Sequence, residues 1–286
     1  MTNLLIGLVP LIVGLVPTDD ETGRSPFPVG HRGLLSHAPE NTLAGFRACI
    51  DLQIGFELDV RRAGDGTLVC LHDETVDRTT DGHGSIHQRT LEQIELLDAG
   101  SWFDSVFSGE PVPTLEDVLT LLKDGRGDRI LVAIDLKVDD ASLADDVVGM
   151  ARRLGVLDRL VMIGLAIGNS DLRRRLREAD PETHVAHLAE SPEQFEAAMS
   201  DPHADWIYVR TIPSPGEVER AHAIGKQVFI AGPKVAGVEP INWREAAQSG
   251  VDAVLTDHPL EFRRTFRGDK RSRDSAQTRS HQEGAP

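Results

Sequence analysis

Short apolar runs alternate with helical stretches through the second half of the chain. Each run has the length of a buried strand, and each is followed by residues with helical spacing. Two of these helices have a start signal, Ser191-Pro192 and Ser214-Pro215, in which a cap residue precedes proline. This rhythm predicts βα units around a parallel sheet. The predicted strands are 130–136, 160–165, 184–188, 206–209, 227–230 and 253–256.

Two more strands are expected nearer the N-terminus. Residues 29–31 are followed by a loop, and Leu43, Phe46 and Ile50 then recur at helical spacing. Residues 56–60 alternate in polarity, as a strand with one buried face does. Counting the run at 68–72 as the return of a hairpin, the chain has eight parallel strands. We therefore predict an α/β fold, a (β/α)₈ TIM barrel.

The hairpin is predicted from Asp65-Gly66, a strong signal for a tight turn. The residues between Val60 and Leu68 are too few for a helical crossover, so the chain should fold straight back. If Asp65 and Gly66 are the two central turn residues, continuing the ladder places His72 opposite Asp59.

The chain is expected to form one domain with a segment at each end. We predict a barrel over 27–267, interrupted at about 74–128 by an insertion that contains no convincing barrel strand. Residues 268–286 are polar and poor in apolar side chains, which predicts a disordered tail.

Residues 4–16 are almost all apolar, which marks 1–26 as a separate N-terminal segment. The run is too short for an ordinary transmembrane helix and resembles a signal-peptide core or an anchor. Residues 1–3 carry no basic side chain, however, and no cleavage pattern follows. The alternatives are a segment packed against the barrel bottom and an incorrectly assigned start codon. Export or membrane association through 4–16 is favoured over a cytoplasmic location.

The composition limits the partners. The chain has 30 Lys plus Arg against 46 Asp plus Glu, a formal net charge of −16. This surface disfavours nucleic acid and anionic membranes, although one local positive site could still hold a small phosphodiester. Cys49 and Cys70 form no zinc or CxxC pattern and are expected to be small buried hydrophobes. The sequence leaves the oligomeric state open.

The stretch from His31 to His72 concentrates groups that could carry chemistry. The period of a strand puts Glu57 and Asp59 on one face, where two carboxylates are costly without a positive partner. They offer hard oxygen ligands with no thiolate nearby, which suits Mg²⁺ or Ca²⁺. Two histidines flank them, and histidine is suited to proton transfer near neutral pH.

An ordered set of motifs resembles the glycerophosphodiester phosphodiesterase family. The motifs are His31-Arg32-Gly33, Pro39-Glu40-Asn41-Thr42, Glu57-Leu58-Asp59-Val60, His72-Asp73 with Arg78-Thr79-Thr80, Pro113-Thr114-Leu115-Glu116, and Thr256-Asp257. The resemblance covers roughly residues 27–265 and implies a barrel of the phospholipase C-like phosphodiesterase type. It also implies hydrolysis of glycerophosphodiesters to an alcohol and sn-glycerol 3-phosphate with a divalent cation.

The resemblance assigns roles to individual residues. It implies that His31 and His72 form the general acid/base pair, that Arg32 and Lys137 bind phosphate, and that Glu57 and Asp59 bind the metal. The family's usual third ligand lies in Ile-Glu-x-Lys, which here reads Ile134-Asp135-Leu136-Lys137, so Asp135 is the third expected ligand. Asp is shorter than Glu by one methylene, which could move the ion or admit a water.

Several alternatives stay open for these residues. Arg32 and Lys137 could merely pair with nearby acids. Glu40 and Asn41 could line the site or simply begin the first helix.

Two other functions stay open for the whole protein. Residues 228–233 depart from the family's Trp-Thr-Val-Asn, which favours a related lysophospholipase D-like enzyme or another phosphodiester hydrolase. Asp135 in place of Glu is the one feature that favours a non-catalytic phosphate-binding protein, and retention of both histidines opposes it.

Overall fold

The strands form a closed parallel barrel, as the sequence predicts. The computed structural model describes residues 25–125, 130–138 and 140–266. The strand order is β1-β9-β8-β7-β6-β5-β4-β2-β3, and parallel pairing of β1 with β2 closes the ring. The strands are β1 (Phe27–Gly30), β2 (Gly55–Arg62), β3 (Leu68–Cys70), β4 (Val132–Leu136), β5 (Leu160–Ile163), β6 (His184–Ala189), β7 (Trp206–Val209), β8 (Gln227–Ile230) and β9 (Ala253–Thr256).

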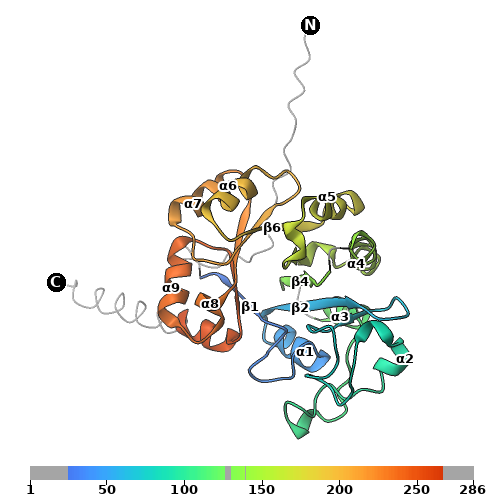
Figure 1. Cartoon of the computed structure of the whole chain (residues 1–286). Coiled ribbons are helices and arrows are strands. Elements are labelled where there is room, and N and C mark those ends of the chain that lie inside the picture. The colour runs from blue at the N-terminus through green and yellow to red at the C-terminus, as the bar shows by residue number, and fades with distance from the viewer. Residues whose placement is uncertain (1–24, 126–129, 139, 267–286) are drawn as a thin grey trace, which may run out of the picture.

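Helices follow the strands and surround the barrel (Figure 1). Ser191 and Ser214 cap α6 (Pro192–Ser200) and α7 (Pro215–Ala223) with Pro at the first helical position, as expected. Residues 259–266 are also helical and follow β9. The other helices are α1 (Leu43–Asp51), α2 (Leu91–Ile94), α3 (Leu115–Asp124), α4 (Ala141–Leu154), α5 (Ser170–Ala179), α8 (Pro233–Ala236) and α9 (Pro240–Ser249).

The insertion after the hairpin forms a small lobe beside α1 and α3 (Figure 1). Its described residues contain no barrel strand, and its apolar side chains, among them Val76, Ile86 and Ile94, form a small cluster with Val69 and Leu71 of the hairpin. The lobe ends at α3, whose apolar side packs on the barrel. The N-terminal segment at 4–16 and the tail predicted at 268–286 lie outside the described residues.

The hairpin forms, but its predicted register is wrong by one residue. Val60 pairs with Cys70, so Asp59 lies opposite Leu71 and not opposite His72. The loop has three residues, 64–66, because the N–H of Ala63 donates to the carbonyl oxygen of Thr67. Gly66 has a φ of +94°, which typifies the last residue of a three-residue hairpin loop and strongly favours glycine. His72 therefore lies just beyond the ladder.

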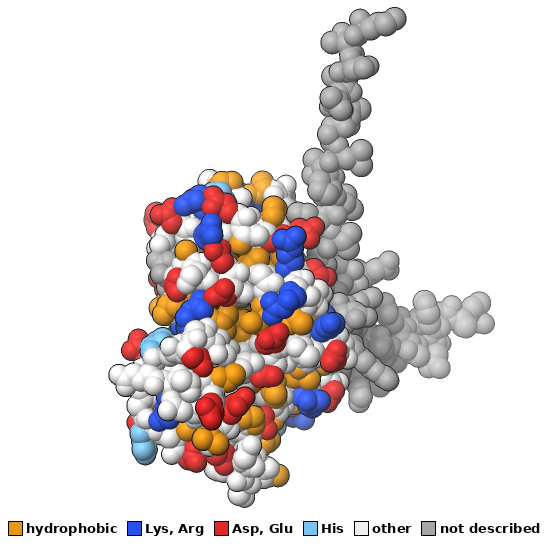
Figure 2. Space-filling model, turned by 90° about the vertical axis from the view of Figure 1, so that its right-hand side faces the viewer, with side chains coloured by type: hydrophobic (Ala, Val, Ile, Leu, Met, Phe, Trp, Pro, Cys, Tyr) orange, Lys and Arg blue, Asp and Glu red, His pale blue; other side chains and the backbone are white. Residues whose placement is uncertain are grey.

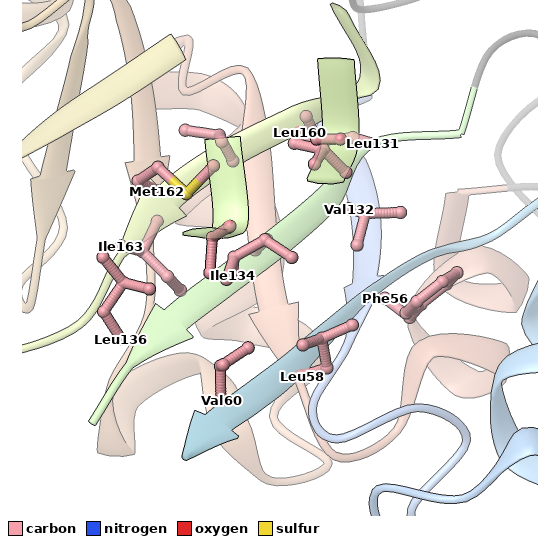
Figure 3. Close-up of a cluster of buried hydrophobic side chains, with 14 of the residues drawn as sticks. Phe56, Leu58, Val60, Leu131, Val132, Ile134, Leu136, Leu160, Met162 and Ile163 are labelled. Carbon is pink, nitrogen blue, oxygen red and sulfur yellow. The ribbon is translucent and has the colours of Figure 1, made fainter. Parts of the chain in front are cut away.

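Alternation along β2 separates the packing face from the polar face. Phe56, Leu58 and Val60 join the apolar side chains of β4 and β5 in a buried cluster (Figure 3). Phe56 also stacks on Phe46 of α1, with 4.8 Å between the ring centroids. Burying a large apolar side chain contributes roughly 1.5–3 kcal/mol, so this face fixes the register of the strand. The intervening carboxylates must then point into the barrel.

The surface shown in Figure 2 mixes acidic, basic and hydrophobic side chains, without an extended basic area on that face. This agrees with the acidic composition. Within the described ranges, none of the helices combines the length and the apolar character that crossing a bilayer requires. Cys49 and Cys70 are buried free thiols, as expected.

Candidate active site

The carboxyl ends of the strands surround a pocket of about 380 Å³. Its lining contains all but three of the residues that the sequence singles out. His31 follows β1, His72 follows β3, and Asp135 and Lys137 lie on and just after β4. A (β/α)₈ barrel presents its chemistry at this end, so these strand ends bring distant parts of the sequence together. The expected site residues that line the pocket are His31, Arg32, Glu57, His72, Asp135 and Lys137.

Three carboxylates converge at one side of the pocket. Glu57, Asp59 and Asp135 each offer an oxygen, and these atoms all lie within 4.8 Å of one another. The parallel register explains the convergence, because Asp59 pairs with Asp135 across β2 and β4. Oxygen-only donors at this spacing suit a hard divalent cation. The three expected metal ligands are therefore together, and the Asp in place of Glu still reaches the cluster.

Asp135 reaches the cluster beside Gly164, which has no side chain to obstruct it. A Cβ added at Gly164 would lie 2.0 Å from Asp135 Oδ1. Gly164 also has a φ of +102°, a conformation that other residues rarely adopt. Gly164 is not among the site residues predicted from the sequence, although its place directly after β5 was a signal.

The ammonium group of Lys137 lies between two of the carboxylates. Its Nζ is 2.7 Å from Asp59 Oδ1 and 2.6 Å from Asp135 Oδ2. An ammonium group has three donors, so one is left to contact a ligand in the pocket. Both carboxylates raise the pKa of Lys137, although burial opposes them.

The electrostatics of the cluster show that its negative charge is incompletely neutralised. Burial, together with the charges of Asp59 and Asp135, raises the pKa of Glu57 well above its ordinary value. Burial also raises the pKa of Asp135, and the charge of Asp59 adds to this effect. Asp59 differs, because Lys137, Asn41 and Arg32 outweigh burial and lower its pKa. A bound cation would favour the charged form of Glu57 as well.

Arg32 connects the carboxylate cluster to a buried acid behind it. Its backbone N–H donates to Glu57 Oε2 at 2.8 Å, and Nη1 donates to Glu40 Oε1 at 2.8 Å. Arg78 also binds Glu40, through Nη1 and Nη2 at 2.7 and 2.8 Å. Burial opposes the charged form of Glu40, but the two arginines together lower its pKa. Glu40 therefore does not line the pocket but holds Arg32 in place.

Asn41 likewise acts on a neighbour rather than on the pocket. Its Nδ2 donates to Asp59 Oδ2 at 2.7 Å, and its Oδ1 accepts from the Asp59 N–H at 3.1 Å. Asn41 has a φ of +54°, a conformation that Asn adopts more readily than most residues. The alternative that Glu40 and Asn41 merely begin a helix does not hold, because the N-cap is Thr42.

Both histidines are held by carboxylates. His31 Nδ1 lies 2.7 Å from Asp257 Oδ1, and His72 Nδ1 lies 2.7 Å from Asp73 Oδ1. A carboxylate accepts from Nδ1–H, which leaves Nε2 of each ring to exchange a proton with a ligand. Arg78 donates to Asp73 at 2.6 Å and lowers the pKa of that carboxyl.

Asp257 is a residue to which the sequence analysis gave no role. Its signal is positional, because it directly follows β9 just as His31 directly follows β1. Burial alone would raise the pKa of Asp257, but the hydrogen bond with His31 lowers it overall. The side chains of His31 and Asp257 are 30% and 34% exposed, so this end of the pocket is open to solvent.

Two other histidines, on β6, take no part in this pocket. His184 binds Asp205 and His187 binds Asp201, so they do not share a ligand. Burial opposes ionisation of Asp201, but hydrogen bonds from the N–H of His203, from His187 and from Arg173 lower its pKa to about 2. This network is structural and lies outside the pocket lining.

The residues opposite the carboxylates were also missed from the sequence. Tyr208 and Arg210 come from the end of β7, and Glu190 directly follows β6. The departure from the family at 228–233 also lies here, because Ala231, Gly232 and Pro233 line the same wall. The pocket therefore has a carboxylate-rich side and a second, chemically different side.

Comparisons with known proteins agree with this geometry. The model of the Glycerophosphoryl diester phosphodiesterase family matches residues 31–261. A glycerophosphodiester phosphodiesterase from Caldanaerobacter subterraneus is 48% identical over 81% of this chain and 93% of its own. A probable glycerophosphodiester phosphodiesterase 1 from Mycobacterium tuberculosis is 28% identical over 84% of this chain and 92% of its own.

Solved structures share the fold. A glycerophosphodiester phosphodiesterase from Agrobacterium tumefaciens has a TM-score of 0.71 and 30% identity, covering 83% of this chain and 98% of its own. An Oleispira antarctica phosphodiesterase, solved with the product sn-glycerol-3-phosphate, has a TM-score of 0.69 and 24% identity, covering 84% of this chain and 96% of its own. The chain therefore belongs to the glycerophosphoryl diester phosphodiesterase family, and it is a hydrolase of phosphoric diesters.

Proposed function

We propose that this protein is a divalent-metal-dependent glycerophosphodiester phosphodiesterase that releases an alcohol and sn-glycerol 3-phosphate by two-histidine acid/base catalysis. The observation that carries the proposal is the meeting of two His–Asp pairs and a three-carboxylate cluster in one pocket. A non-catalytic phosphate-binding protein would have no need of two such histidines.

The carboxylate cluster fits a divalent cation. Glu57, Asp59 and Asp135 supply oxygen donors, and among the described residues only Lys137 and Arg32 offset their charge directly. This donor set favours Mg²⁺ or Ca²⁺ over softer metals. When bound, the ion would place positive charge against a non-bridging phosphate oxygen.

The positive side chains of the pocket would hold the rest of the phosphate. Lys137 has an unused donor, and Arg32 lines the pocket with a guanidinium that engages Glu40 through Nη1. Both pair with acids as well, so ion pairing and phosphate contact are compatible roles here. Preorganised donors of this kind stabilise charge that develops in the transition state.

The two imidazoles would move the protons. One takes the proton of the glycerol 2-hydroxyl as its oxygen bonds to phosphorus, and the other protonates the leaving alcohol as its bond breaks. The resulting cyclic phosphate then opens with water, and the two rings exchange roles. Asp257 and Asp73 keep Nε2 of His31 and His72 available throughout.

The test is metal-dependent release of glycerol 3-phosphate from glycerophosphocholine by the purified protein. Activity should disappear with EDTA and return with Mg²⁺ or Ca²⁺, and His83→Ala, a change at an exposed residue, should be unaffected. Lysophosphatidylcholine tests the related lysophospholipase D-like function. Hydrolysis of lysophosphatidylcholine alone, or hydrolysis unaffected by EDTA, would contradict the proposal.

A further inference from the structure

Two opposite charges line the pocket on the side away from the carboxylate cluster. Glu190 directly follows β6 and Arg210 directly follows β7, next to the paired residues Ala189 and Val209. Strand β7 lies four positions from β2 in either direction around the ring. The guanidinium of Arg210 is therefore across the pocket from Glu57 and Asp59, and not beside them.

Arg210 lacks the carboxylate partner that the other cations of the pocket have. Arg32 and Lys137 lie 2.6–2.8 Å from carboxylate oxygens. Arg210 Nη1 instead donates to the neutral Tyr208 Oη at 3.2 Å, and in the described ranges this is the only hydrogen bond of its side chain. A half-buried guanidinium of this kind can bind an anionic group without first breaking an ion pair.

Small residues leave this guanidinium uncovered. Gly232 lies beside it, and a Cβ added there would be 3.6 Å from Arg210 Nε. Ala231, the residue before it, also lines the pocket. These two residues belong to the segment that departs from the family, so the departure creates open space next to a positive charge.

Glu190 provides the complementary charge. Its side chain is exposed and lines the same pocket, yet it forms no ion pair with Arg210 or with any other described residue. Its backbone N–H is fixed by Gln194 Oε1 at 2.6 Å. The wall thus offers one carboxylate and one guanidinium, both free to bind a ligand that carries the two opposite charges.

We propose that Arg210 and Glu190 select diesters whose alcohol carries an amino acid group, with glycerophosphoserine as the preferred substrate. Arg210 would bind the serine carboxylate and Glu190 its ammonium group. The glycerol half of the substrate is neutral, and in the proposed function the phosphate is bound at the opposite wall. The leaving alcohol is therefore the part of the substrate that would pair with these two charges. The inference rests on the proposed function and specifies its substrate class.

The experiment compares four diesters that share glycerol and phosphate: glycerophosphoserine, glycerophosphoethanolamine, glycerophosphocholine and glycerophosphoglycerol. The kcat/KM of each is measured from glycerol 3-phosphate release for the parent, Arg210→Gln and Glu190→Gln. Arg220→Gln is the matched control, because Arg220 pairs with Glu196 on the outer helices. Circular dichroism checks that each variant folds.

We expect the parent to prefer glycerophosphoserine over glycerophosphoethanolamine by about tenfold or more, as one charge-assisted hydrogen bond provides. Arg210→Gln should abolish that preference by raising KM for glycerophosphoserine. Glu190→Gln should lower kcat/KM for the serine and ethanolamine diesters relative to glycerophosphoglycerol. Arg220→Gln should have the same kcat/KM values as the parent.

Three outcomes would overturn the inference. The parent could hydrolyse all four diesters equally, or Arg210→Gln could lower every kcat/KM by the same factor, which would place Arg210 on the phosphate. If the parent hydrolyses none of the four, the proposed function fails and this inference fails with it. The parent's own activity therefore separates the two failures.

Discussion

Gly164 offers a direct test of whether Asp135 belongs to the metal site. Gly164→Ala adds one methyl group, which would lie 2.0 Å from Asp135 Oδ1. Contact this close is impossible, so the carboxylate must leave its present position beside Glu57 and Asp59. The change should thus displace a proposed ligand without altering any residue of the proposed ligand set.

The expected magnitude follows from mass action. An ion at 100 times its Kd stabilises the fold by about 2.7 kcal/mol, and for a chain of this size that corresponds to roughly 5–10 °C in Tm. Disturbing even the partners of metal ligands typically weakens affinity by about 10–100-fold. At 100-fold weaker affinity and the same ion concentration, the stabilisation falls to about 0.4 kcal/mol, or about 1 °C.

The assay is thermal melting with and without Mg²⁺ or Ca²⁺, supported by a calorimetric titration. Gly155→Ala is the matched control, because Gly155 also has a positive φ, of +72°, but open space around it. Both variants should lose about 1–2 kcal/mol of stability without metal from backbone strain. Only Gly164→Ala should lose the metal-dependent shift in Tm.

Asp135→Ala serves as the reference background. In that background, Gly164→Ala should cause no further loss of metal affinity, because the carboxylate it displaces is already gone. An undiminished metal-dependent shift in Gly164→Ala, or in Asp135→Ala alone, would refute the reasoning and remove Asp135 from the ligand set.

Three other predictions concern proton transfer, acid stability and the N-terminal segment. His31→Ala and His72→Ala should each lower kcat by about 10²–10⁴-fold, and the double variant by little more; near-normal turnover in either would contradict the acid/base assignment. Asp201→Asn should lower the free energy of unfolding at pH 7 by about 1–2 kcal/mol, relative to the control Asp158→Asn, a change at an exposed residue. Because the folded pKa of Asp201 is depressed to about 2, this difference should shrink as the pH falls from about 4 to 2, and a constant difference in urea unfolding would be evidence against it. Deletion of residues 1–21 should leave a soluble, active barrel, because the first barrel strand begins only at Phe27; an insoluble or strongly destabilised product would contradict this and show that 4–16 packs into the structure.

Much of the barrel follows from local patterns in the sequence. The predicted ranges 206–209, 227–230 and 253–256 coincide with β7, β8 and β9, because short apolar runs between polar turns leave little freedom in where a buried strand begins. Part of the carboxylate cluster was also predictable, since the strand period fixes the shared face of Glu57 and Asp59. The place of Asp135 came instead from the family motif.

The remaining features depend on geometry that no local pattern encodes. The predicted hairpin register was wrong because Asp65-Gly66 is compatible with both a two-residue and a three-residue loop. The structure has the three-residue loop. The links between Glu40 and Arg78 and between His31 and Asp257 appear only when the ring closes. Each link joins charged groups that are far apart in the sequence, so neither the helical nor the strand period relates them.

The pair of His31 and Asp257 joins the first strand of the barrel to the last, across a sequence separation of 226 residues. Under the proposed mechanism, half of one proton-transfer unit is therefore made early in synthesis and the other half near the end. A nascent chain that still lacks β9 holds His31 without its carboxylate, so the proposed pair is complete only when the final strand emerges and docks. Turnover would then report completion of the barrel, and a chain that ends before residue 257 should lose most of its activity.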